Sequence, residues 1–278
     1  MDGKQGTRLH VGCAQWTHKA WEFSAAQDRL KAYAEWCDAV EGNTTFYATP
    51  SRETVAGWAR QTPEDFRFVL KLPKPVTHEH RLGLGGGEDL TRFLHAVEPL
   101  GQRIHALWVQ LPGSFGPGDL DVLAAFLRRL PASYDYAVEV RHPGFFEEPR
   151  ALESVLEKAG AEWVPFDTTV MFASPPVSDM ERDAWMKKPR MPRRTRALTA
   201  RPIVRYLGRD DTARTVEGWQ PWVEIAAEWL KEGRSPTVFV HTPDNVEAPA
   251  LARRFHEEVR RRTPGLKPLP EPVPTTLF

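Results

Sequence analysis

Three charged residues, Glu41, Lys71 and Glu139, are the side chains in this sequence best suited to acid/base chemistry. Each stands at the end of a short apolar run that predicts a buried strand. An unpaired ion in such a place costs several kcal/mol, so these charges must pair with one another or with a ligand. Two carboxylates flanked by cations can be driven to different pKa values, which lets one pocket hold a proton donor and a proton acceptor. We predict that all three are catalytic, with Glu139 as the base and Lys71 stabilising developing negative charge.

Further polar and aromatic residues follow other predicted strands. Arg141 and Arg205 offer a two-pronged grip on a phosphate or carboxylate. Trp16 and Tyr47 can stack on a sugar or base, although core packing is the simpler role for either one. A purely structural ion-pair network is the alternative interpretation. We predict a small anionic or sugar-like ligand held by Trp16, Asn43, Tyr47, Thr77, His78, Gln110, Arg141, His142, Asp167, Arg205 and His241.

The elements that must position these residues are parallel strands alternating with helices. Apolar runs separated by amphipathic stretches are typical of βαβ units. Eight runs are visible, at 9–13, 39–41, 66–72, 104–110, 136–140, 163–167, 203–206 and 237–241. A length of 278 residues suits a closed α/β barrel, in which all strands end on one face and active sites are built there. We therefore predict a single (β/α)8 TIM-type barrel over 1–278, with its core at about 9–262.

Local sequence signals predict where two of the helices begin, and they indicate one interruption of the alternation between strands and helices. Ser51 can cap a helix that runs toward Gln61, and Pro149 suits the first turn of one that runs to Ala159. A long regular helix in residues 168–202 is prevented by Pro175, Pro176, Pro189 and Pro192. This predicts an inserted loop between strands six and seven, which is our lid candidate. Beyond it, a proline-rich tail at 263–278 either wraps the surface or frays.

Composition excludes several classes of protein. Lys plus Arg and Asp plus Glu both total 37, so the formal charge is zero and nothing attracts the whole molecule to nucleic acid or acidic lipid. The first thirty residues hold no apolar run typical of a signal peptide, and no stretch is apolar enough to span a bilayer. Cys13 and Cys37 do not form a close-spaced metal or redox pair. We expect a cytoplasmic protein with no membrane partner.

A metal site and a nucleic-acid site stay open as alternatives. The oxygen and nitrogen donors that can converge on a divalent metal are Glu41, Glu139, Asp167 and His241. Three nearby cations would repel a metal, so we expect no cofactor. The segment Lys187 to Arg205 carries eight basic residues and no acidic one. A solvated loop is the usual explanation, but the segment can also track a nucleic-acid backbone, as in a barrel endonuclease that cleaves phosphodiesters.

Several segments together resemble the YecE-like proteins, classed as domain of unknown function 72. The resemblance covers roughly 9–260 and rests on segments 11–16, 40–47, 62–71, 77–82, 110–112 and 138–143. It implies a (β/α)8 barrel with a polar pocket at the strand ends, and no established reaction. The chain departs from the family pattern at His241-Thr242, where paired asparagines are usual, and at Tyr206-Leu207-Gly208, where a histidine and glycine are usual. Hydrolase, lyase and isomerase chemistry therefore stay open, as does a noncatalytic ligand-binding role.

Overall fold

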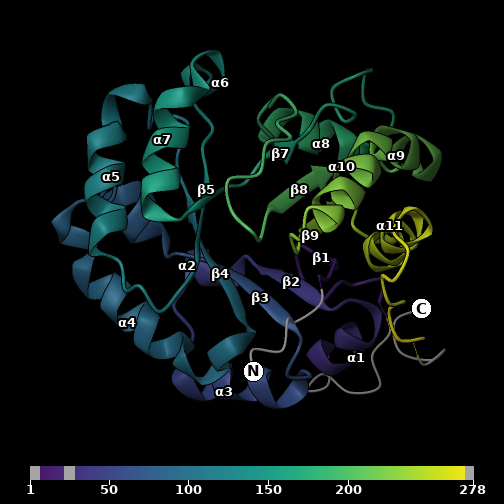
Figure 1. Ribbon diagram of the computed structural model, residues 1–278, viewed down its shortest axis with the longest axis horizontal. Coiled ribbons are helices and arrows are strands. Elements are labelled where there is room, and N and C mark those ends of the chain that lie inside the picture. Colours follow the sequence, from purple (N-terminus) through teal and green to yellow (C-terminus); the bar gives the residue numbers. More distant parts are fainter. Residues whose placement is uncertain (1–6, 22–28, 273–278) are drawn as a thin grey trace.

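A single curled sheet of parallel strands forms the centre of the molecule. The computed structural model describes residues 7–21 and 29–272. Figure 1 shows the helices lying around the outside of the strands. Within the described residues the strands are β1 (His10–Cys13), β2 (Ala39–Gly42), β3 (Arg67–Lys71), β4 (Ile104–Gln110), β5 (Tyr136–Glu139), β6 (Glu162–Trp163), β7 (Phe166–Asp167), β8 (Ile203–Leu207) and β9 (Thr237–His241).

Helices follow most of the strands, as the alternating sequence pattern predicts. They are α1 (Arg29–Trp36), α2 (Thr44–Tyr47), α3 (Arg52–Gln61), α4 (Gly87–Val97), α5 (Leu120–Arg129), α6 (Gly144–Glu147), α7 (Pro149–Ala159), α8 (Asp179–Lys187), α9 (Thr212–Gly218), α10 (Gln220–Lys231) and α11 (Ala248–Arg262). Shorter turns of helix are η2 (Pro75–Glu79), η3 (Leu84–Gly86), η4 (Glu98–Arg103) and η5 (Pro117–Asp119). The Ser51 cap of α3, which accepts from the Thr54 amide, and the start of α7 at Pro149 are both confirmed.

The order of the strands is β6-β5-β4-β3-β2-β1-β9-β8-β7. The two strands at its ends are separated by only Val164 and Pro165. The Val164 amide donates to Val138 O at 2.9 Å on one side, and the Arg205 amide donates to Pro165 O at 3.0 Å on the other. Because proline has no amide hydrogen, the ladder is interrupted there. The strand predicted at 163–167 is therefore two short strands, and the architecture is a barrel-like α/β fold.

Side chains alternate between the two faces of the sheet, with a period of two residues. The concave face holds an apolar cluster made of Ala39, Val69, Ala106, Trp108, Ala137, Val164, Ile203 and Phe239. Residues of the opposite parity, such as Phe68 and Val138, pack in the larger core beneath the helices. The next side chain on the concave face stands two residues further along the strand, at its carboxyl end. Lys71 follows Val69 in this way, and Glu139 follows Ala137.

The segment between β7 and β8 contains a helix that the sequence did not indicate. Residues 168–202 were predicted as a loop, but α8 occupies nine of them. Its start is capped by Ser178, whose hydroxyl accepts from the Glu181 amide at 3.0 Å. The prolines precede and follow this stretch, so they limit the length of the helix and do not prevent it. We call residues 168–202 the insertion.

The described part of the proline-rich tail lies against the body of the molecule. Leu266 and Leu269 pack on the main core, and Arg253 donates to Pro270 O at 2.8 Å. The rest of the predicted tail, 273–278, lies outside the described residues. In the part of the chain that the structure covers, every helix is too short or too polar to cross a bilayer.

Candidate functional site

Glu41 is the centre of a buried ionic cluster at the carboxyl ends of the strands. Its side chain has no exposed area. Lys71 Nζ lies 3.0 Å from Glu41 Oε1. Arg205 Nε and His241 Nε2 lie 3.1 and 3.0 Å from Oε2. These residues come from four different strands, so the sheet brings together side chains that are far apart in the sequence.

Glu139 is the second carboxylate of the cluster and is incompletely paired. Its Oε1 accepts from Arg141 Nε at 2.8 Å. Its Oε2 has no hydrogen-bond partner among the described residues. The nearby Arg205 Nη1 is 3.7 Å away, which is too far for a hydrogen bond. The side chain is fully buried, so this oxygen is an unsatisfied acceptor held among cations.

Gln110 and Arg141 complete what we call the Glu41–Glu139 cluster, which contains Glu41, Lys71, Gln110, Glu139, Arg141, Arg205 and His241. Lys71 Nζ donates to Gln110 Oε1 at 2.7 Å. Trp108 lies beneath, with Lys71 Nζ 4.8 Å from the centre of its ring. The Arg141 side chain is 25% exposed, compared with 5% for Lys71. Arg141 therefore forms the side of the cluster that meets solvent.

Both carboxylates are ionised at neutral pH. Burial raises the pKa of Glu41, but Arg205 and Lys71 outweigh it and hold the pKa well below its usual value. Burial also opposes ionisation of Glu139, and Arg141 and Arg205 lower its pKa. The expected division into one proton donor and one acceptor is therefore wrong for these two glutamates. Arg205 and Lys71 act on both carboxylates, Arg141 adds to their effect on Glu139, and neither glutamate is forced to keep its proton.

The pKa values of Lys71 and His241 are also lowered, but for these two groups a lower pKa favours the neutral form. Burial lowers the pKa of Lys71 to about 8, although Glu41 opposes the shift. Burial and then Arg205 lower the pKa of His241 to about 4, so this ring is neutral at neutral pH. Lys71 is thus the group in the cluster that gains or loses a proton closest to neutrality, while Glu139 is ready to accept one.

Asp167 does not join the Glu41–Glu139 cluster in the described structure. Its Oδ2 accepts from Arg193 Nε at 2.8 Å and from Trp222 Nε1 at 2.7 Å. The physical reason is strand alternation, because Asp167 is three residues beyond the inward-facing Val164 and so points to the helices. Phe166 takes the inward place instead, with Arg205 Cζ 4.3 Å from the centre of its ring.

Thr77 and His78 belong to the η2 turn that follows β3. Thr77 Oγ1 and His78 Nδ1 are 2.9 Å apart, and the histidine ring meets Phe46 edge to face with ring centres at 4.9 Å. Burial and then Arg141 lower the pKa of His78 to about 4. A neutral His78 therefore lies in the electrostatic field of the cations of the cluster.

Four other predicted ligand-binding residues have no hydrogen bond or ion pair to the cluster within the described chain: Trp16, Asn43, Tyr47 and His142. Trp16 packs edge to face against Trp58, with ring centres 5.3 Å apart. Asn43 donates to Ala14 O at 2.8 Å and so ties two strand ends together. Tyr47 is 79% exposed. Their role in binding stays a prediction.

The basic run at Lys187–Arg205 is largely neutralised by neighbouring carboxylates. Its ion pairs join Lys187 to Asp183, Arg193 to Asp167, Arg194 and Arg196 to Glu153, Arg201 to Asp135, and Arg205 to Glu41. Lys188 differs, because its pKa is lowered by burial and then by Arg205, with Glu41 opposing the shift. Lys188, which directly follows α8, is therefore close enough to the cluster for its pKa to respond to the charges there.

Two contributors to the site were missed from the sequence. Trp108 was hidden in an apolar run, yet it stands two residues before Gln110 and so shares its face of β4. The alternation of side chains along the strand, counted back two residues from Gln110, is the sequence signal that identifies Trp108. Lys188 carries no such signal, because only the folded insertion brings it near. Across the described residues, no group of three or more His, Cys, Asp or Glu side chains is arranged to hold a metal ion.

Fold and site together define a barrel-like α/β protein with a buried ionic cluster at the carboxyl ends of parallel strands. A family model described as "Protein of unknown function DUF72" matches residues 10–275. The UPF0759 protein YecE of Escherichia coli strain K12 is 38% identical over 275 residues, which are 97% of this chain and 100% of that protein. The same protein from strain O157:H7 has the same identity and coverage. The chain belongs to the DUF72 family, as its motifs predict.

Solved structures of the same family have the same fold. A DUF72 family protein from Thermotoga maritima MSB8 matches with a TM-score of 0.69 at 23% identity, covering 89% of this chain and 99% of that one. Another from Enterococcus faecalis V583 matches with a TM-score of 0.66 at 19% identity, covering 92% and 97%. At these identities the likeness concerns the fold alone.

Proposed function

We propose that this protein is an enzyme that removes a proton from a small anionic or sugar-like molecule, with Glu139 as the base. The observation that carries the proposal is the buried Glu139 Oε2, which has no hydrogen-bond partner among the described residues. A buried acceptor without a partner in the protein is suited to accept a hydrogen bond or a proton from a bound molecule. The lowered pKa keeps Glu139 ionised, so the carboxylate carries no proton at neutral pH, and it also makes this group a weaker base than a free glutamate.

The surrounding cations support an anionic ligand. Lys71, Arg141 and Arg205 face two carboxylates, so positive charge is in excess and can be balanced by a phosphate or carboxylate group. Arg141 is the most accessible of the three and is the natural first contact. Lys71 can stabilise negative charge that develops as the proton leaves. Lyase and isomerase reactions fit this step, whereas a hydrolase would use the same base to remove a proton from an attacking water molecule.

We further propose that the sheet is a closed (β/α)8 barrel in which β6 and β7 act as one strand. Support comes from Val164 and Pro165, which bond to β5 and to β8 respectively. In a closed barrel the carboxyl ends of all eight strands surround one opening, so their side chains would meet at a single site.

Proton abstraction can be tested without knowing the product. Wild-type protein in D2O is incubated with sugar phosphates and with 2-oxo and 2-hydroxy acids, and NMR follows the loss of carbon-bound hydrogen signals. We expect exchange in at least one compound and its loss in Glu139→Gln, which preserves the size of the side chain. Glu153→Gln is the matched control, since Glu153 is also buried and paired with arginines but lies outside the cluster.

Three results decide between the functions. Exchange that survives in Glu139→Gln, with the fold intact by circular dichroism, excludes Glu139 as the base. Binding of a panel compound without exchange by the wild-type protein favours a noncatalytic ligand-binding role. A nucleic-acid role is less favoured, because carboxylates already neutralise most of Lys187–Arg205. A complex in gel-shift titrations that weakens steeply with salt would restore it.

A further inference from the structure

A cavity lies beside the insertion, away from the Glu41–Glu139 cluster. Its volume is about 390 Å³, within the range that holds small molecules. The start of the insertion forms one wall with Val170, Ala173 and Ser174, and α9 forms another with Arg214 and Glu217. None of the residues that line it is a member of the cluster. The cavity therefore represents a separate candidate binding site.

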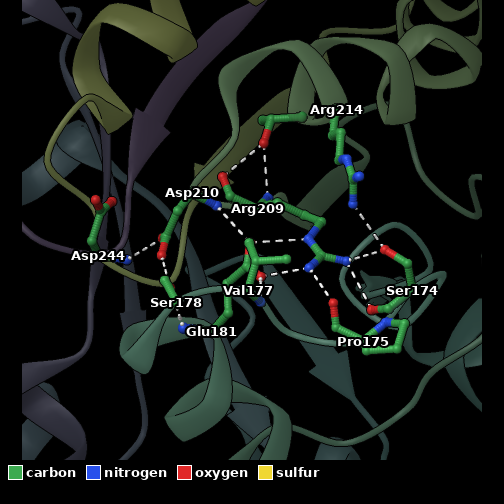
Figure 2. A network of polar contacts seen from close by, with 10 residues as sticks. Ser174, Pro175, Val177, Ser178, Glu181, Arg209, Asp210, Arg214 and Asp244 are labelled. Atoms are coloured by element: carbon green, nitrogen blue, oxygen red, sulfur yellow. Dashed lines mark hydrogen bonds and ion pairs between the residues drawn. The ribbon is translucent and has the colours of Figure 1, made fainter.

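Two opposite charges on α9 line this cavity and remain unpaired. Arg214 Nη1 donates to Ser174 Oγ at 3.0 Å, a contact visible in Figure 2, but no carboxylate in the described chain pairs with it. The side chain of Glu217 likewise has neither an ion pair nor a hydrogen bond within the described residues. Three residues apart on one helix, the two could have paired with each other. The cavity is instead lined by a cation, Arg214, and an anion, Glu217, that are not paired with each other.

The other arginines of the lining have fixed roles. Arg193 donates from Nε to Asp167 and from Nη2 to Gly218 O at 3.2 Å, which leaves Nη1 without a partner among the described residues. Figure 2 shows that the Arg209 guanidinium is instead surrounded by acceptors, and it has no free donor to offer. Arg193 and Arg214 are therefore the groups that can bind an anionic group here.

We propose that this cavity binds a small zwitterion of the amino-acid type. A carboxylate would bind to Arg214 and the free edge of Arg193, because guanidinium groups grip carboxylates with two parallel hydrogen bonds. An ammonium group would bind to Glu217. The side chain of the ligand would lie on Val170 and Ala173. A plain anion would leave Glu217 unpaired and repelled, so the mixed charge of the lining favours a ligand that carries both signs. This inference does not depend on the proposed function.

The test uses the full-length protein and the twenty proteinogenic L-amino acids as individual probes. Thermal shift identifies those that stabilise the protein, and calorimetry measures their affinity. We expect at least one to bind, and Arg214→Gln and Glu217→Gln each to weaken it by about tenfold or more, the effect of losing one charged hydrogen bond. Both side chains are exposed, so neither substitution should disturb the fold. Removing the amino group or the carboxylate from the ligand should weaken binding to a similar extent.

Glu139→Gln is the control that distinguishes this cavity from the Glu41–Glu139 cluster. A ligand that binds in the cavity beside the insertion should bind this variant with unchanged affinity. The proposal is overturned if none of the twenty amino acids binds, or if binding is equally strong in the Arg214 and Glu217 variants. It is also overturned if the analogue without an amino group binds as tightly, which would indicate a simple anion site. Loss of binding in Glu139→Gln alone would assign the ligand to the Glu41–Glu139 cluster.

Discussion

Two of the buried carboxylate–arginine groups in the molecule differ in how completely they are paired. The first, between the insertion and the end of β8, joins Glu181 and Arg209. Glu181 Oε1 accepts from Arg209 Nε at 3.0 Å and from the Asp210 amide at 3.2 Å, and Oε2 accepts from Arg209 Nη2 and from the Val177 amide. The remaining Arg209 donors reach Ser174 and a backbone carbonyl (Figure 2).

The second group, the Glu41–Glu139 cluster, is just as buried but lacks such completeness. Glu139 Oε2 has no hydrogen-bond partner in the described chain, and Glu41 Oε1 lies near Lys71 without the geometry of a hydrogen bond. A protein gains nothing structurally from a half-paired buried network. The comparison therefore indicates that the Glu181–Arg209 pair fastens the insertion to the barrel, whereas the unpaired acceptor of the cluster is the feature on which the proposed binding role rests.

The largest effect should come from breaking the complete pair. Arg209→Met leaves Glu181 buried without its cation, and we expect the free energy of unfolding to fall by about 3–5 kcal/mol. Urea denaturation followed by circular dichroism measures this. Arg182→Met on the exposed face of α8 is the matched control and should cost less than about 1 kcal/mol. Equal effects of the two substitutions would contradict a fastening role for Arg209.

A double variant tests whether the pair acts through its charges. Arg209→Met combined with Glu181→Leu removes both charges and leaves no lone buried ion, so it should be more stable than Arg209→Met alone. If the double variant is as unstable as the single one, the pair acts through its packing and its backbone contacts more than through its charges.

Much of the fold and of the cluster could be predicted from the sequence because both follow from local pattern. Apolar runs located the strands, and charged residues at their ends must pair once buried. The prediction for Asp167 is wrong because this residue is an odd number of positions beyond an inward-facing one, so strand alternation turns its side chain toward the helices. Pro165, inside the predicted strand 163–167, already indicated an interrupted ladder.

The Glu181–Arg209 pair could not be predicted in the same way. Its members are 28 residues apart, and one of them lies on a helix inside a segment without apolar periodicity. Neither residue ends a predicted strand, so no period of two or of 3.6 residues links them. Only the path of the insertion back over the barrel brings the carboxylate to the guanidinium, and that path depends on the tertiary structure as a whole.

The next effect concerns Lys71 and the pH dependence of stability. Its pKa is about 8 in the folded protein and 10.5 in the unfolded chain. Between these values the unfolded chain binds more protons, so the free energy of unfolding should rise with pH across this window, by at most about 3 kcal/mol. Urea denaturation at pH 7, 8, 9 and 10 measures the rise.

Lys71→Met provides the control for that measurement, because every other titrating group is shared with the wild-type protein. The difference in stability between wild type and variant should grow in favour of wild type as the pH rises from 8 to 10. Parallel curves would show that Lys71 keeps an ordinary pKa when folded. The cluster would then be better solvated, and more like a surface network, than its burial indicates.

The smallest effect belongs to the periphery of the Glu181–Arg209 pair. Ser174 Oγ accepts from Arg209 Nη1 at 2.7 Å, but the same nitrogen also donates to Ser174 O, which any residue at this position retains. Ser174→Ala should therefore lower the free energy of unfolding by only about 1 kcal/mol. Ser114→Ala, which removes an exposed hydroxyl that accepts from Arg81, is the control and should be close to neutral. A loss at Ser174 as large as that of Arg209→Met would mean that the serine hydroxyl, and not the carboxylate, holds the arginine in place.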